Sequence, residues 1–196
     1  MPVSIIAILP QQAEELSELC QQIYREVYPY LWHDGGEWYM KTRYNMLQLK
    51  TEIEHPNVAY YFVKNTDNQP IGHLKLNLDS NAIAGNTESY GDSSTKLYDP
   101  KIAQEMAALN GLELERIYFL SNATGKGMGQ ETLDFVLKEA RLLHKDYVWL
   151  HVMDSSPAKK FYGRNGFTTC GETILPFELM KPQYRRMFKM WKKCNL

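Results

Sequence analysis

The second half of the chain alternates between strand-like and helix-like segments, and this alternation constrains the fold more than any other feature of the sequence. It predicts, in chain order, a strand at 112–120, a helix at 127–144, a strand at 147–153, a helix at 157–164 and a strand at 167–175. Such a series is typical of an α/β sheet, in which a ligand binds where a strand end opens onto a helix start. The segment 183–192 predicts a last, antiparallel strand.

The first half of the chain has a different order of elements. An apolar run at 3–9 predicts a strand, and apolar residues at helical spacing then predict a helix over 13–27. A second helical stretch, rich in aromatic residues, covers about 38–54. The segments 58–64 and 71–78 are separated by turn-forming residues, so we expect them to pair as a β-hairpin.

The length of 196 residues fits one domain, 1–196, because two domains of half this size would each be marginal. An apolar fraction of 44% is enough to form a core. Residues 79–99 are rich in Asn, Ser, Gly and Thr without periodicity, which predicts a loop excursion from that core. The segment 100–109 predicts a short helix.

Charge and cysteine usage limit the classes of partner. The formal net charge of −1 gives no overall basic field, so we expect no binding to nucleic acid. No stretch approaches the roughly 18 apolar residues of a membrane span, so we expect no membrane association. The three cysteines are far apart, and neither they nor the five histidines show metal-ligand spacing, so we expect no disulfide framework and no metal. These patterns favour a cytoplasmic protein with a small-molecule partner.

Three alternating glycines, Gly125, Gly127 and Gly129, lie directly between a predicted strand and a predicted helix. Without side chains, such a turn lets backbone N–H groups point at a bound anion, and the start of the following helix favours negative charge. The turn therefore predicts a pyrophosphate site. It is neither a Walker loop, which needs Ser or Thr after its lysine, nor a GxGxxG fingerprint. From the glycines alone, a strand-to-helix turn without a ligand remains the alternative.

A second motif, SSPAKKFYGRNGF, follows about thirty residues later at 155–167. Within it, Ser156 is a good N-cap with Pro157 at the first helical position, and Gly166 can end the helix. With the turn at 124–129, this motif resembles the GNAT superfamily of N-acetyltransferases. The superfamily patterns are Gln/Arg-x-x-Gly-x-Gly/Ala and, later, Asn-x-x-Ala-x-x-Phe-Tyr-x-x-x-Gly-Phe.

The sequence departs from the superfamily patterns at two positions and also resembles one group within the superfamily. Thr124 stands where the superfamily has Gln or Arg, and Ser155 stands where it has Asn. Within the superfamily, 114–118 and 71–77 look like the PaiA-type polyamine acetyltransferases of bacteria. The resemblance implies a GNAT fold of the α/β class, with a mixed, mostly antiparallel central sheet of about seven strands. The sheet is splayed at the cofactor site and flanked by about four main helices.

The resemblance implies acetyl-CoA as the co-substrate. Its pantetheine is expected against the backbone of Ile117, Tyr118 and Phe119, whose N–H groups bind the cofactor and polarise the thioester carbonyl. The other implied contacts are Thr124, Gly125, Lys126, Gly127, Met128, Gly129, Gln130, Ser155, Ala158 and Tyr162. Tyr162 is where the superfamily has a tyrosine that protonates the departing thiolate. The alternative for Tyr162 is packing in the core as an aromatic residue. We assign its neighbour Phe161 to the core.

Two carboxylates are candidates for the acceptor side. Glu113 and Glu115 alternate along one strand face with Ile117 and Phe119, so both are expected to point into one cleft. Glu115, the nearer to the acetyl carbon, would take the amine proton through water or attract a cationic substrate. The alternative is a solvent-exposed charge or a structural charge pair with Arg116.

Three rings between the first two predicted helices, Tyr28, Tyr30 and Trp32, are candidates for substrate binding, together with His73 and Glu113. Core packing is the alternative for the rings. The resemblance implies an N-acetyltransferase that acts on a primary amine by direct transfer. The acceptor is a polyamine or another small amine, or alternatively a protein amino terminus or lysine. A catalytically silent acyl-CoA-binding module is a hypothesis of another class, and homodimer formation stays open.

Overall fold

The structure is a computed structural model that describes residues 3–79 and 95–194. These residues form two compact units. The first unit consists of residues up to 77 together with 115–136, and the second consists of the residues from 78 to 114 and from 137 onward. One strand and one helix contribute residues to both units, and each unit is described by itself below.

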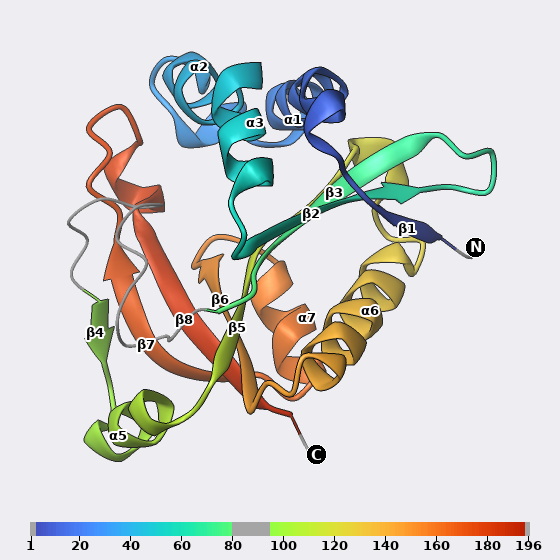
Figure 1. Ribbon diagram of the computed structural model, residues 1–196. Helices are drawn as coiled ribbons and strands as arrows, with labels where there is room; N and C mark the ends of the chain where they lie inside the picture. The colour runs from blue at the N-terminus through green and yellow to red at the C-terminus, as the bar shows by residue number, and fades with distance from the viewer. Residues whose placement is uncertain (1–2, 80–94, 195–196) are drawn as a thin grey trace. The chain divides into compact units, whose positions relative to one another are not determined.

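The first unit contains three complete strands, three complete helices and parts of two further elements (Figure 1). These are β1 (Ser4–Ala7), α1 (Ala13–Val27), α2 (Glu37–Arg43), α3 (Met46–Glu54), β2 (Val58–Lys64), β3 (Pro70–Asn77), the second half of β5 (Gly111–Phe119) and the start of α6 (Met128–Leu142). The strand order is β1-β2-β3-β5. The strands β2 and β3 pair antiparallel, which confirms the predicted hairpin. Helix α1 packs against β3, and α3 packs against β2.

The helix predicted over 38–54 is two helices, because Asn45 ends one and starts the next. Its side-chain carbonyl accepts a hydrogen bond from the backbone N–H of Gln48 at 2.9 Å, which caps the start of α3. Its amide group donates to the backbone carbonyl of Lys41 at 2.9 Å, in the last turn of α2. One asparagine therefore satisfies backbone groups of both helix ends.

The second unit contains the remaining strands and helices. These are β4 (Thr95–Leu97), α5 (Pro100–Ala108), the first half of β5, the end of α6, β6 (Tyr147–Met153), α7 (Ala158–Arg164), β7 (Thr168–Ile174) and β8 (Arg186–Lys193). The strand order is β5-β6-β8-β7-β4, and β8 pairs antiparallel with both β6 and β7, as predicted. Met106 of α5 lies in a buried core with Tyr147, Trp149, Cys170 and Trp191.

The strand β4 was not expected, since 79–99 was predicted to be a loop excursion. Residues 80–94 lie outside the described part of the chain, but Thr95–Leu97 pairs antiparallel with β7. Gly171 of β7 permits this close approach, because a Cβ there would lie 2.6 Å from the carbonyl oxygen of Lys96. The prediction of a loop is therefore wrong for these three residues.

The strands β5 and β6 are parallel, but their ladder is shorter than either strand. It joins four residue pairs, from Gly111 with Tyr147 to Leu114 with Leu150, while β5 continues to Phe119. Within the described residues, β5 does not pair with β6 beyond Leu114. The eight strands of the described residues form a mixed, mostly antiparallel sheet, one strand more than predicted. The predicted fold class is thus confirmed.

Candidate functional site

The predicted phosphate turn lies in the first unit, between a short 3-10 turn at Ser121–Ala123 and the start of α6 at Met128. Gly125 and Gly127 have φ values of 76° and 83°, in the left-handed region that favours glycine. A Cβ on either glycine would have nothing within 4 Å, so both face open space. The left-handed backbone and the open space together explain why the sequence places glycines here.

The backbone amides of this turn are available for an anion. Within the described residues, no hydrogen bond uses the N–H groups of Gly125, Lys126 or Gly127. The carbonyl of Gly127 accepts from Gln130 N at 2.9 Å, which starts a helix of 15 residues directly after the turn. Exposed amides at the start of a long helix are the donors that a pyrophosphate requires, so the turn fits the diphosphate of coenzyme A.

The side chains of the turn contribute less than its backbone. Thr124 donates its hydroxyl hydrogen to the carbonyl of Ser121 at 2.9 Å, which ties it to the preceding turn. Met128 is buried beside Ile71 and Ala123, so its side chain belongs to the core. Gln130 donates to Asp134 at 3.0 Å. These three side chains are engaged within the protein, whereas in the described part of the chain the backbone N–H groups of 125–127 are not.

The strand segment that precedes the turn has a close neighbour on β3. A Cβ on Gly72 would lie 2.5 Å from the carbonyl oxygen of Tyr118 and 2.6 Å from the ring of Phe119. The N–H of Leu120 donates to the carbonyl of Ile71 at 2.9 Å. The three predicted pantetheine-binding residues, 117–119, are half-buried, whereas the preceding residues of β5 are buried. The backbone of β3 therefore supports this segment directly.

The second predicted motif lies in the second unit and forms α7. The hydroxyl of Ser156 accepts a hydrogen bond from Ala158 N at 3.2 Å, and Gly166 ends the helix with a φ of 82°. The helix ends where predicted, at Arg164, but it begins at Ala158, so Pro157 takes the N-cap position instead of the first helical position. Ser155, which precedes this cap, is exposed.

Tyr162 of α7 is the more deeply buried of the two adjacent rings. It is 5% exposed, and its ring contacts Phe161 and Phe167 at centroid distances of 5.2 and 5.6 Å. Phe161, for which the sequence predicts a place in the core, is only half-buried.

Most of the rings predicted to bind substrate belong to an aromatic cluster of the first unit. Trp32 is 2% exposed and donates its indole N–H to the hydroxyl of Tyr24 at 2.7 Å. The ring of Tyr28 lies 5.1 Å from that of Tyr118. Tyr30 is 44% exposed. Packing in the core thus accounts for Trp32, and Tyr28 is the ring that contacts the predicted cofactor strand.

His73 is fully buried among three tyrosine rings. The ring centroids of Tyr118, Tyr44 and Tyr60 lie 5.6, 6.3 and 6.5 Å from that of His73. Neither ring nitrogen of His73 has a hydrogen-bond partner within the described residues. Burial lowers the pKa of His73 to about 3, with Arg116 adding to the effect, so the imidazole is neutral at physiological pH.

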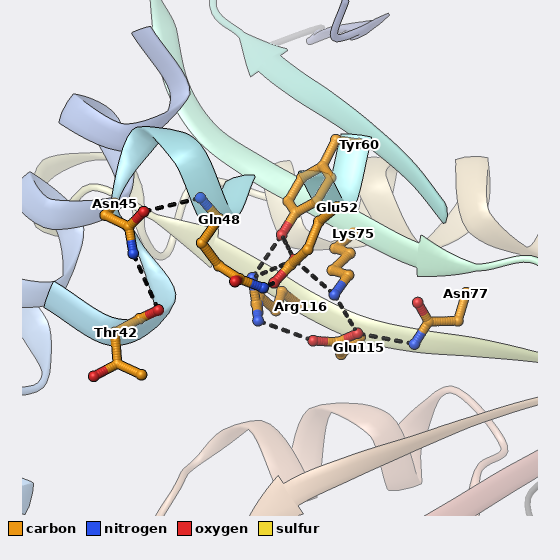
Figure 2. A network of polar contacts seen from close by, with 9 residues as sticks. All are labelled: Thr42, Asn45, Gln48, Glu52, Tyr60, Lys75, Asn77, Glu115 and Arg116. Atoms are coloured by element: carbon orange, nitrogen blue, oxygen red, sulfur yellow. Dashed lines mark hydrogen bonds and ion pairs between the residues drawn. The ribbon is translucent and has the colours of Figure 1, made fainter. Parts of the chain in front are cut away.

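Glu115 lies in a cluster of four charged side chains in the first unit, here called the buried ion cluster (Figure 2). Its members are Glu52 of α3, Lys75 of β3, and Glu115 and Arg116 of β5. Lys75 Nζ lies 2.8 Å from Glu52 Oε2 and 2.7 Å from Glu115 Oε2. Arg116 lies 3.0 Å from Glu115 Oε1 and 3.4 Å from Glu52 Oε2. All but Glu52 have side chains no more than 5% exposed, and Glu52 is 12% exposed.

Neutral side chains complete the hydrogen bonds of this cluster. Asn77 donates to Glu115 Oε2 at 2.8 Å, and Arg116 donates to the hydroxyl of Tyr60 at 2.6 Å. That hydroxyl in turn donates to Glu52 Oε2 at 2.5 Å. Burial alone would raise the pKa of Glu115, but Arg116 and Lys75 outweigh it and hold the pKa below its ordinary value. Glu115 is therefore a buried carboxylate that pairs with Arg116, as the alternative expected, and with Lys75 as well. It is not exposed to solvent.

Glu113 has different neighbours from Glu115. It lies in the second unit, is 1% exposed, and interacts electrostatically with Lys189 of β8. Strand alternation predicted that Glu113 and Glu115 point into one cleft. Neither unit contains both carboxylates, so neither unit by itself shows such a cleft. Sequence reasoning also missed Glu52, Lys75 and Asn77. The alternation of His73, Lys75 and Asn77 along one strand was the only local signal.

Two further findings concern metals and membranes. Within 3–79 and 95–194, no group of three or more His, Cys, Asp or Glu side chains is placed to hold a metal ion. In the same part of the chain, no helix has the length and apolar character needed to cross a bilayer.

Comparison with known proteins gives one family and several related structures. The model of the acetyltransferase (GNAT) family matches residues 17–167. An uncharacterized N-acetyltransferase encoded in the pepI 3' region of Lactobacillus delbrueckii subsp. lactis is 29% identical over 137 residues, or 69% of this chain. The match spans 66% of that relative, just under two thirds of its length.

Two solved structures share the fold over nearly the whole chain. The PaiA N-acetyltransferase of Thermoplasma acidophilum in complex with coenzyme A has a TM-score of 0.65 at 18% identity, covering 98% of this chain and 99% of its own. The spermidine N-acetyltransferase of Vibrio cholerae in complex with CoA and spermine has a TM-score of 0.65 at 15% identity, covering 97% and 95%. At these identities the likeness establishes the fold alone.

Proposed function

Because the chain belongs to the GNAT family of acetyltransferases, whose co-substrate is acetyl-CoA, we propose that it transfers an acetyl group directly to a primary amine. The observation that carries this proposal is the glycine turn before α6. It combines two left-handed glycines, unused backbone amides and the start of a 15-residue helix. Acetyl-CoA supplies a thioester carbonyl for the amine to attack and a thiolate as leaving group.

We assign roles to this chain's own residues as follows. The amides of 125–127 and the start of α6 bind the pyrophosphate, with Thr124 and Gln130 at the edges of this site. The backbone N–H groups of 117–119 orient the pantetheine and polarise the carbonyl. The hydroxyl of Tyr162 gives its proton to the thiolate, and Ala158 lies one helical turn before Tyr162 on α7.

The removal of the amine proton is a separate step. The pKa of Glu115 is lowered, so this carboxylate is a weak base. Both of its oxygens already accept hydrogen bonds from neighbouring side chains. We therefore propose that water takes the amine proton and that Glu115 acts through its neighbours. This differs from the role of direct or water-relayed base that the sequence suggested for it.

We propose a polyamine or another small amine as the acceptor. The fold is shared with a PaiA N-acetyltransferase and with a spermidine N-acetyltransferase, and this likeness supports the choice. Tyr28 and Tyr30 stay candidates for contact with the acceptor, whereas Trp32, His73 and Glu113 are buried and are not assigned such a contact. We also place the protein in the cytoplasm, where its free cysteines stay reduced.

The test is Tyr162→Phe, measured by thiol release from acetyl-CoA with spermidine, amino acids and short peptides as acceptors. We expect kcat to fall by about 10²- to 10⁴-fold while binding of CoA is retained, because only the proton donor is lost. Gly163→Ala is the matched control on the same helix, since a Cβ at Gly163 has nothing within 4 Å.

An unchanged kcat for Tyr162→Phe would remove Tyr162 from the reaction. Turnover with peptides but not with small amines would favour a protein acceptor. Binding of CoA without turnover on any acceptor would favour a silent acyl-CoA-binding module.

A further inference from the structure

The buried ion cluster is balanced in charge, and each of its four carboxylate oxygens has a hydrogen-bond or ion-pair partner. Its two carboxylates, Glu52 and Glu115, face two cations, Lys75 and Arg116, at distances of 2.7 to 3.4 Å. Replacing such buried pairs by apolar residues is often neutral or stabilising, so a gain in stability alone does not explain the cluster. A fully satisfied polar network does fix the geometry of the backbone segments that carry it.

The cluster fixes an irregular point of β5. Consecutive residues of a regular strand point to opposite faces, yet Glu115 and Arg116 both reach Glu52 or Lys75 in the same cluster (Figure 2). The strand therefore departs from regular pleating at these two residues. The parallel ladder with β6 ends immediately before them, at Leu114.

The residues that follow the cluster are those proposed to bind pantetheine. Ile117 is directly bonded to Arg116 in the chain, and 117–119 lose the deep burial of the preceding strand. The guanidinium of Arg116 is held by two carboxylates and the hydroxyl of Tyr60, and it lies 5.3 Å from the ring centroid of Tyr44. A planar group fixed on so many sides leaves the adjoining backbone little freedom.

We infer that the buried ion cluster is a positioning device for the acyl-transfer site, with Arg116 and Glu115 as positioning residues that aim the N–H groups of 117–119 at the cofactor. Helix α3 takes part through Glu52, so the helix and the hairpin β2–β3 both hold the cofactor strand in place. This inference rests on the proposed function, because it assumes that these amides contact acetyl-CoA.

The experiment compares three variants in the full chain. Glu115→Gln keeps the shape but leaves two cations sharing one carboxylate. Arg116→Lys keeps the charge but loses the planar fork. The double variant Lys75→Met with Glu115→Gln removes one cation and one carboxylate and so restores the balance. For each, we would measure kcat, KM for acetyl-CoA, the affinity for CoA by calorimetry, and amide hydrogen exchange at 117–119 without ligand.

We expect both single variants to raise KM for acetyl-CoA by about 10- to 100-fold, because a small displacement of aligned donors is costly. Amide exchange at 117–119 should become faster, while kcat changes less than KM. The double variant should recover most of this loss. Glu54→Gln is the matched control, since Glu54 lies on the same helix in an exposed pair with Lys50.

Three results would overturn the inference. A loss of kcat of about 10²-fold or more in both Glu115→Gln and the double variant, with KM unchanged, would make Glu115 the base. Variants that lower only the melting temperature would make the cluster purely structural. A double variant no better than Glu115→Gln would contradict charge balance as the cause.

The controls also separate this inference from the proposed function. If Glu115→Gln does not fold, Arg116→Lys and the double variant still test whether the cluster positions 117–119. If the wild type binds CoA but acetylates no amine, the proposed function fails. CoA affinity and amide exchange would still show whether the cluster positions 117–119.

Discussion

Gly72→Ala is the substitution that most directly links the support of β5 to cofactor binding. An alanine Cβ at this position would lie 2.5 Å from the carbonyl oxygen of Tyr118, and ordinary contact begins at 3.4 Å. The backbone of β5 must therefore move by about 0.9 Å, the difference between these two distances. We expect KM for acetyl-CoA to rise by up to about 100-fold, because a shift of this size misplaces the N–H groups of 117–119.

The control for this variant is Gly171→Ala in the second unit. Its Cβ would lie 2.6 Å from the carbonyl oxygen of Lys96, so the clash is of the same kind but falls on β4. Overpacking of this type costs about 1–3 kcal/mol of unfolding free energy, which denaturant titration would measure in both variants. Gly171→Ala should leave KM for acetyl-CoA unchanged. Equal effects of the two variants on KM, or none from Gly72→Ala despite lost stability, would refute the reasoning.

Two further predictions concern the glycine turn and acid stability. Gly125→Ala forces a side chain into a φ of 76° at a cost of about 1–2 kcal/mol, and it should raise KM for acetyl-CoA about 5- to 30-fold. The control is Gly35→Ala, at a φ of 70° with equally open space, which should leave KM unchanged. Equal KM values for the two variants would contradict this prediction. The pKa of His73 is about 3 in the folded protein against an ordinary 6.5, so the unfolded chain binds more protons between these values and stability falls as the pH drops below 6.5. His73 should contribute about 2 kcal/mol to the loss of unfolding free energy between pH 7 and pH 5, and urea titration of His73→Gln should show a correspondingly smaller loss; the same loss as in the wild type would contradict the assignment.

The sequence predicted those elements whose structure depends on residues close together in the chain. The helix α1 buries Leu16, Leu19 and Ile23, whose spacing of three and four predicted it. The glycine turn and the end of α7 at Gly166 were also predictable, because each needs glycine at a left-handed backbone position. These parts of the fold and of the site are encoded within short stretches of chain.

Other features depend on contacts between distant segments. The strand β4 has only three residues and no periodicity of its own, and its place is set by the missing side chain of Gly171. The break between α2 and α3 follows from the two-sided bonding of Asn45. Neither feature has a periodic signal in the sequence.

The buried ion cluster was not predictable for the same reason. Lys75 and Glu115 meet only after β3 and β5 have come together, and Glu52 arrives from a helix. Strand alternation directed Glu115 away from Arg116, whereas the structure brings both into one cluster. The departure from alternation is a tertiary property, and it changes the role assigned to Glu115.

The most direct test of the central claim is mass spectrometry of the products formed by the wild-type protein from acetyl-CoA and a panel of primary amines that includes spermidine. We predict one acetyl group on an amine nitrogen for each thiol released, with formation of both products slowed together in Tyr162→Phe. Thiol release without an acetylated amine, or no reaction with any amine while CoA binds, would contradict the account.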